Sequence, residues 1–143
     1  DLSWLRETKD ISFLQDCKDL LSLNLSSCVQ INDFSFLQHC KDLLSLNLSG
    51  CVQIDDFSFL QHCKDLLSLN LSGCIQIRDF SFLQHCKELT KLDLTHCRQI
   101  NDTIVRLVRH NRIQVITKTY FKTRAPVYPF LGELTIGNGL LKL

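Results

Sequence analysis

The sequence contains no methionine and no uninterrupted apolar run of about 18 residues, the length that a membrane-spanning helix needs. Since 45% of the residues are hydrophobic, we expect a soluble, globular chain that does not enter a membrane. Residues 1–3 align with residues 24–26, in the middle of a repeated unit, and the initiator methionine is missing. We therefore expect a fragment or a processed product.

The short motifs that carry catalysis are also missing. The chain has no G-x-S-x-G elbow, no glycine-rich phosphate loop and no H-E-x-x-H pair. A catalytic site requires different residues that meet at one point, whereas Ser45, Ser68 and Asn70 are common residues repeated by duplication. We expect no enzyme, no catalytic residue and no cofactor.

Cysteine is abundant, but the close C-x2-C pairs of metal sites are absent. The eight cysteines fall alternately 11 and 12 residues apart, at two fixed positions of one unit: Cys17, Cys28, Cys40, Cys51, Cys63, Cys74, Cys86 and Cys97. Neighbouring strands lie about 4.8 Å apart, farther than the ~3.8 Å between Cβ atoms that a disulfide prefers. We expect buried, reduced thiols, no metal, and an intracellular, reducing compartment such as the cytoplasm.

A 23-residue repeat dominates what is present. Residues 33–55 and 56–78 match at 21 of 23 positions; residues 10–32 differ from 33–55 at four positions, and residues 79–101 differ from 56–78 at eight. A fixed period of this size indicates stacked units that share one continuous core. The chain is therefore expected to form a solenoid.

Each unit contains the pattern L-x-x-L-x-L-x-x-C, seen at Leu43, Leu46, Leu48 and Cys51. The alternation of leucine with serine and asparagine is typical of a half-buried strand. This motif resembles the leucine-rich-repeat family. The resemblance implies an α/β fold, a right-handed solenoid with a concave parallel β-sheet and short helical or 3-10 segments on the convex side.

Two subtypes of that family resemble the repeat. The cysteine at the ninth motif position, followed by Ile54 and an aspartate, is similar to the cysteine-containing repeats of F-box adaptors, whereas the short return at residues 56–60 is similar to internalin-like repeats. Asp56 is expected to cap the return, with Phe57, Leu60 and Cys63 pointing inward. We expect the eight cysteines in the core together with Leu46, Leu48, Leu69, Leu71, Phe57, Phe80, Leu60 and Leu83.

The repeats are expected to span residues 1–101, as a partial first repeat and four full repeats from residue 10. Residues 102–143 are expected to form a degenerate repeat and a C-terminal cap. A helix is predicted over 102–110 and a strand over 113–116. Residues 131–136 predict a last strand or a capping hairpin.

Histidines form a second repeated row at His39, His62 and His85, each before a core cysteine and so expected on the outer surface. Stacked imidazoles could chelate a divalent metal or become protonated together near pH 6. Asp16 replaces histidine in the first copy, and no fixed acidic partner accompanies the row. A solvated surface is the favoured interpretation.

The concave face is expected to present the variable positions of the strands. In the first three copies these are small and polar, and they lack the aromatic and arginine side chains that dominate protein hot spots. The fourth copy diversifies. The candidate partner-binding residues are Ser45, Asn47, Ser49, Ser68, Asn70, Ser72, Lys91, Asp93, Thr95 and His96.

Charge is divided unequally along the chain. Residues 1–97 hold 8 Lys/Arg and 13 Asp/Glu (−5), whereas residues 98–143 hold 8 and 2 (+6). Such asymmetry can indicate nucleic acid or another anionic partner, and the candidate anion-binding residues are Arg98, Arg106, Arg109 and Arg112. The alternative is a soluble cap whose charges face water.

Together these features favour a non-enzymatic module, monomeric in isolation, that binds a protein partner through its concave face and C-terminal end. An anionic-ligand or nucleic-acid binder acting through residues 98–124 remains an alternative. A purely structural, consensus-like repeat array is another.

Overall fold

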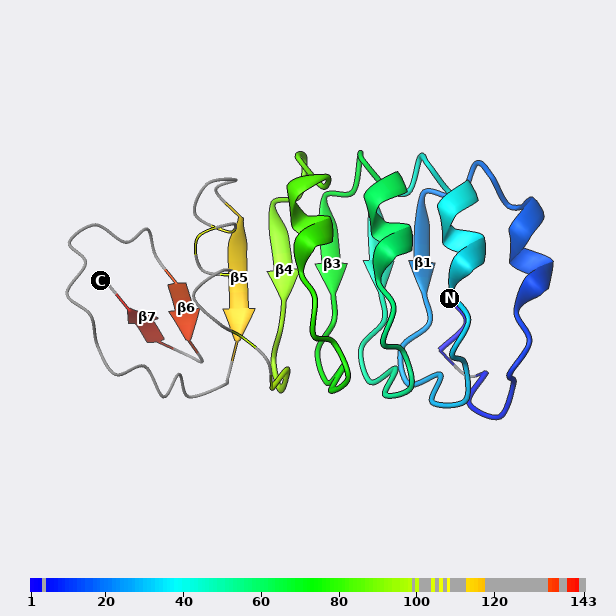
Figure 1. Cartoon of the computed structure of the whole chain (residues 1–143), viewed down its shortest axis with the longest axis horizontal. Coiled ribbons are helices and arrows are strands. Elements are labelled where there is room, and N and C mark those ends of the chain that lie inside the picture. Colours follow the sequence, from blue (N-terminus) through cyan, green and yellow to red (C-terminus); the bar gives the residue numbers. More distant parts are fainter. Residues whose placement is uncertain are drawn as a thin grey trace.

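In a computed structural model, the chain forms a row of stacked coils (Figure 1). The structure describes residues 1–3, 5–98 and 100, then Ile104, Arg106 and Val108, and residues 113–117, 134–136 and 139–141. We number the full repeats as coil 1 (residues 10–32), coil 2 (33–55), coil 3 (56–78) and coil 4 (79–101). The predicted leucine-rich-repeat solenoid is confirmed.

Each coil contributes one three-residue strand to a parallel sheet (Figure 1). The strands are β1 (Ser22–Asn24), β2 (Ser45–Asn47), β3 (Ser68–Asn70) and β4 (Lys91–Asp93). Their register places each central leucine beside its copy 23 residues away, as in Leu46 beside Leu69. Since side chains alternate between the two faces of a strand, this register stacks the central leucine of each strand inward and the polar residues on either side of it outward.

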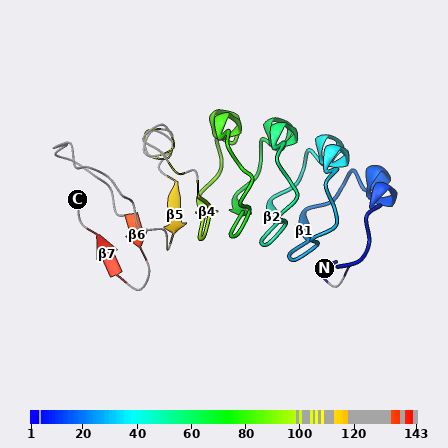
Figure 2. The same ribbon diagram turned by 60° about the horizontal axis from the view of Figure 1, so that its bottom comes forward.

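The return segments form 3-10 helices on the opposite, convex side, which Figure 2 shows as the outer arc of the row. They are η1 (Ser12–Asp16), η2 (Ser35–His39), η3 (Ser58–His62) and η4 (Ser81–Gln84). Phe57 is the N-cap residue of η3, and the predicted capping contact of Asp56 comes from one residue earlier: its carboxylate accepts a hydrogen bond from the Ser58 backbone N–H at 2.8 Å. The Ser58 N–H and then its hydroxyl lower the pKa of Asp56, because both stabilise the carboxylate.

The core lies between the sheet and the 3-10 helices. Every leucine and phenylalanine predicted to be inside is buried. A second phenylalanine of each return was not predicted to be inside, yet Phe36, Phe59 and Phe82 are buried as well. Phe59 stacks on Phe34 of the preceding coil with ring centroids 6.2 Å apart. The packing of neighbouring coils therefore buries a position that looks peripheral within one coil.

The cysteines form two ladders, and none of the eight is in a disulfide. Cys51 Sγ donates to the Leu25 carbonyl at 3.2 Å, and Cys74 Sγ donates to the Leu48 carbonyl at the same distance. Seven of the eight cysteines are buried, as predicted; the prediction is wrong for Cys17, which is exposed. The physical reason is that, among the described residues, only η2 packs against η1, so the other side of η1 stays open.

Beyond coil 4 the sheet continues with β5 (Gln114–Thr117), β6 (Leu134–Ile136) and β7 (Gly139–Leu141). β5 and β6 extend the parallel order, and β7 pairs antiparallel with β6. The predicted strand at 113–116 is confirmed within one residue. Ile104, Arg106 and Val108 are helical, and the rest of the helix predicted over 102–110 lies outside the described residues.

Candidate functional site: the concave face

Two rows of polar side chains cross the concave face at right angles to the strands. Ser22, Ser45 and Ser68 lie side by side and are followed by Lys91 in β4. The second row consists of Asn24, Asn47 and Asn70, followed by Asp93. The sheet therefore brings the predicted Ser and Asn positions together in register, with Lys91 continuing the serine row and Asp93 continuing the asparagine row.

The asparagine row also has a structural role. Asn47 Oδ1 accepts a hydrogen bond from the Ser49 backbone N–H at 3.0 Å, and Asn70 Oδ1 accepts one from Ser72 at 2.9 Å. Asp93 makes the equivalent bond with the Thr95 N–H at 2.8 Å. These bonds turn the chain out of the strand and fix each amide or carboxylate at the sheet surface. The side chains are half-buried.

A left-handed residue follows each of these turns. Gly50 and Gly73 have φ of 74°, and the equivalent Ser27 and His96 have φ of 62° and 64°. Residues with a Cβ rarely adopt this conformation. The hydrogen bonds of the sheet hold it in place, because the Gly50 N–H donates to the Ser72 carbonyl at 2.7 Å.

Coil 4 differs in what it exposes. Lys91 and His96 are exposed, and Asp93 is half-buried. Thr95 is only 8% exposed, so it offers little surface to a partner. Of the four diversified residues, Lys91, Asp93 and His96 are therefore available on the concave face in coil 4.

A third, apolar row borders the concave face, and sequence reasoning missed it. Leu21, Leu44 and Leu67, which we call the leucine row, are 56%, 38% and 43% exposed. They immediately precede the serine row, at the start of each strand, and Thr90 takes the equivalent place in coil 4. The signal was the doubled leucine of the first three copies, because only the first of each pair, such as Leu43, packs into the core.

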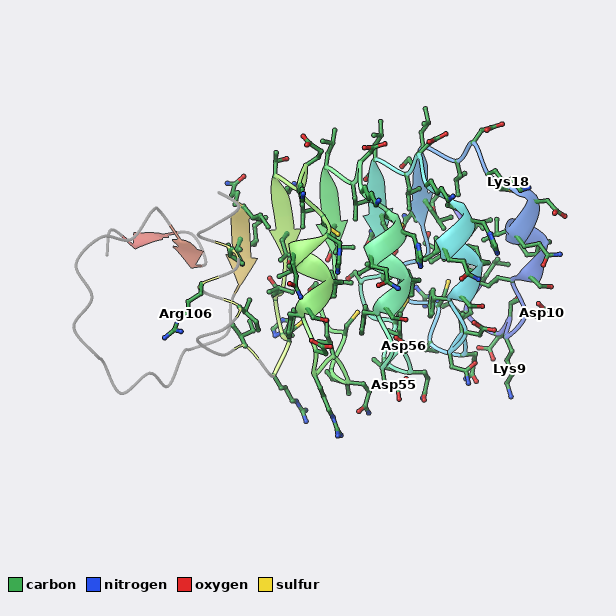
Figure 3. All side chains as sticks on the ribbon, turned by 45° about the horizontal axis from the view of Figure 1, so that its top comes forward. Lys9, Asp10, Lys18, Asp55, Asp56 and Arg106 are labelled. Carbon is green, nitrogen blue, oxygen red and sulfur yellow. The ribbon has the colours of Figure 1, made fainter. Side chains whose placement is uncertain are left out.

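The basic candidates are only partly described. Arg98 and Arg106 are exposed, and in Figure 3 the Arg106 side chain projects away from the coils. Arg109 and Arg112 lie outside the described residues.

On the convex side, a hollow between coils 3 and 4 is lined mainly by acidic and polar side chains, among them Asp56, Asp79 and His85, together with Asp55 from the last position of coil 2. Figure 3 shows Asp55 and Asp56 beside the turn that leads into η3. His39, His62 and His85 are exposed, as predicted. Within the described part of the chain, no three His, Cys, Asp or Glu side chains gather closely enough to hold a metal ion.

The sequence matches two related family profiles. Residues 41–85 match "Leucine Rich repeats (2 copies)", and residues 85–107 match "Leucine Rich repeat". Over residues 41–107 the chain therefore carries repeats of the leucine-rich-repeat family. Proteins of this family generally mediate protein–protein interaction and are generally non-enzymatic. A search of curated protein sequences finds no significant match.

Solved structures of internalins from Listeria monocytogenes are similar to this leucine-rich-repeat chain. An internalin, inlF, has 26% sequence identity and a TM-score of 0.66 over 78% of the chain. Internalin C2 has 20% identity and a TM-score of 0.52 over 82% of the chain, a likeness of fold. The chain spans 34% of the length of the first and 66% of the second. Among the described residues, no helix is long and apolar enough to cross a membrane.

Proposed function

We propose that the chain is a non-enzymatic recognition module that binds a protein partner through its concave face and the C-terminal end of that face. The supporting observation is the contrast along the rows: three coils present Ser and Asn, and coil 4 presents Lys91 and Asp93 at the same two positions. Small neutral side chains contribute little anchoring energy, whereas a charged pair can select a partner and its orientation. Coils 1–3 then set the length of the surface, and coil 4 supplies specificity.

A charge reversal at coil 4 tests this function. The immobilised chain is used to capture proteins from an extract of its source cells, and each captured protein is quantified by mass spectrometry. Lys91→Glu should reduce capture of a genuine partner by about tenfold or more, because an attractive contact becomes repulsive. Ser45→Ala with Ser68→Ala should change capture by less than about threefold.

Asp93 requires a different substitution, because its carboxylate also bonds the Thr95 N–H. Asp93→Asn removes the charge and keeps the acceptor, as Asn70 shows in coil 3, whereas Asp93→Lys would break the turn. A partner that is lost on Gln61→Ala or His62→Ala, yet retained by Lys91→Glu, would place recognition on the convex face. If no partner is captured at all, the structural-array interpretation is correct.

The anionic alternative draws support from the exposed Arg98 and Arg106 and from the +6 charge of residues 98–143. Binding of DNA, RNA or heparin through these side chains would fall steeply with salt, because counterions are released. It would also weaken on Arg98→Gln with Arg106→Gln. Weak binding that is unchanged in this variant would assign these arginines to a solvated cap.

We further propose an intracellular, reducing location. The support is chemical: seven thiols are buried and bond backbone carbonyls, and Cys17 is a free thiol at the surface. A reducing compartment preserves such a set of thiols. Mass spectrometry after alkylation in intact source cells would contradict this location if it found Cys17 oxidised or disulfide-linked.

A further inference from the structure

We infer that the leucine row receives one amphipathic α-helix of the protein partner, lying along the solenoid axis with a carboxylate opposite Lys91. This inference rests on the proposed function and names the kind of partner segment that the surface fits. Surface leucines that occur singly need no explanation. Here three recur in register at one margin of the face proposed for binding.

The row is held rigidly by the backbone. The Leu44 N–H donates to the Leu21 carbonyl at 2.8 Å, and the Leu67 N–H donates to the Leu44 carbonyl at 2.8 Å. The Thr90 N–H continues the ladder to the Leu67 carbonyl at 2.9 Å. A surface fixed in this way loses little backbone freedom when a partner binds.

The spacing of the row decides between a helix and a strand. Two steps along the row cover about 9.6 Å at the usual strand separation. Two turns of an α-helix cover about 10.8 Å, whereas two same-face steps of an extended strand cover about 13 Å. A helix with apolar residues at i, i+4 and i+7 therefore stays in step with all three leucines, and a strand does not.

The charged side chains near the leucine row indicate at which end of the partner helix a carboxylate should lie. Beside the row, each of coils 1–3 places one lysine and one carboxylate in the turn before its exposed leucine, as Lys41 and Asp42 do in coil 2. That margin has no net charge. On the sheet side, the neighbouring positions are serines until Lys91, whose exposed ammonium stands where the apolar row ends. Asp93 lies two residues further along the same strand, so the carboxylate of the helix is expected on the Thr90 side of Lys91.

Two synthetic helical peptides test the inference. Both carry leucines at i, i+4 and i+7; one has Glu a turn beyond the last leucine, and the other has Lys there. Binding to the whole chain is measured by fluorescence anisotropy. The Glu peptide should bind about tenfold more tightly than the Lys peptide, and Lys91→Glu should reverse that order.

Leu44→Ser with Leu67→Ser should weaken the Glu peptide by roughly tenfold or more, because the contact loses its apolar surface. Phe13→Ser is the matched control: Phe13 is as exposed as Leu21 but lies on η1, away from the row. It should leave binding unchanged. Thermal unfolding of each variant verifies that the exposed substitutions preserve the fold.

The inference is overturned if neither peptide binds, if both bind equally, or if the double serine variant retains full affinity. Partner capture separates this failure from that of the proposed function. If neither peptide binds while Lys91→Glu abolishes partner capture, the proposed binding through the concave face is supported and the inferred partner helix is wrong. If the peptides bind at the row while Lys91→Glu leaves capture unchanged, the row binds helices but the proposed partner surface is wrong.

Discussion

Coil 1 and the inner coils share nearly one sequence, yet they differ in what they bury. Phe13 in coil 1 is 57% exposed, whereas its copies Phe36, Phe59 and Phe82 are 7%, 6% and 3% exposed. Cys17 is exposed, and Cys40, Cys63 and Cys86 are buried. Burial in this solenoid is therefore a property of a pair of neighbouring coils. The free energy of the array resides largely in the interfaces between coils.

The largest predicted effect is a loss of stability at high pH, which depends on the buried thiols and not on the exposed Cys17 of coil 1. Burial raises the pKa of Cys51, Cys63 and Cys97 to about 12 and that of Cys86 to about 11, and for Cys51 and Cys63 neighbouring thiols add to this effect. In the unfolded chain these thiols ionise near pH 8.5. The free energy of unfolding should therefore be highest below that pH and fall as the pH rises toward 11–12, by up to ~1.4 kcal/mol per pH unit per thiol.

Urea unfolding followed by circular dichroism at several pH values measures this loss, which should reach several kcal/mol in total. Cys17→Ser should leave the pH dependence unchanged, because this side chain is exposed in coil 1. Equal stability at pH 8 and 10.5 would refute the buried-thiol account.

Truncation of one phenylalanine in each region gives the next largest difference. Phe59→Ala should lower the free energy of unfolding by about 3–5 kcal/mol, because it leaves a cavity against Phe34 and Phe57. Phe13→Ala should cost less than about 0.5 kcal/mol, the usual range for a surface change. Chemical denaturation checks both. Similar costs at the two sites would mean that something covers Phe13 in solution.

A smaller difference in stability between coil 1 and the inner coils is expected at the left-handed turn. Gly73→Ala should cost about 1–2 kcal/mol, through its positive φ alone. A Cβ there would meet the Gly50 backbone at an ordinary 3.6 Å. In coil 1, Ser27 already bears this strain, so Ser27→Gly should raise stability by up to ~1 kcal/mol. Thermal unfolding measures both, and a loss of stability in Ser27→Gly would contradict the explanation.

The smallest predicted effect is a difference in thiol reactivity between coil 1 and the inner coils. Alkylation of the native protein at pH 8 should modify Cys17 alone, because the other thiols are buried and their pKa values are raised wherever a shift is resolved. Peptide mapping identifies the modified residue. Rapid modification of Cys40 would show that coils 1 and 2 separate readily, since Cys40 lies at their interface and donates to the Cys17 carbonyl.

The sequence alone predicted the elements well, because they depend on local pattern. The alternation around Leu46 predicted the strand, and the aspartate at Asp56 predicted the cap. Both features arise within one 23-residue unit. The repeat then extended them to every coil.

Features that depend on two units were not predictable in the same way. Phe59 is buried only because Phe34 of the preceding coil lies against it. Thr95 was predicted on the concave face, but it is buried in the turn that follows β4. Leu44 carries the same letter as Leu43, and only the path of the backbone separates an exposed from a buried side chain. Residue type fixes none of these outcomes.

The turn at the end of each concave strand carries a consequence for producing the protein. Asn24, Asn47 and Asn70 each begin an Asn-Leu-Ser tripeptide, the acceptor sequence for N-linked sugar. Strands about 4.8 Å apart leave no room for glycans on neighbouring asparagines. A chain made in a glycosylating secretory pathway should therefore lose its open concave face, whereas Asn→Asp at these positions removes the acceptor and keeps the turn, because Asp93 already makes that hydrogen bond in coil 4.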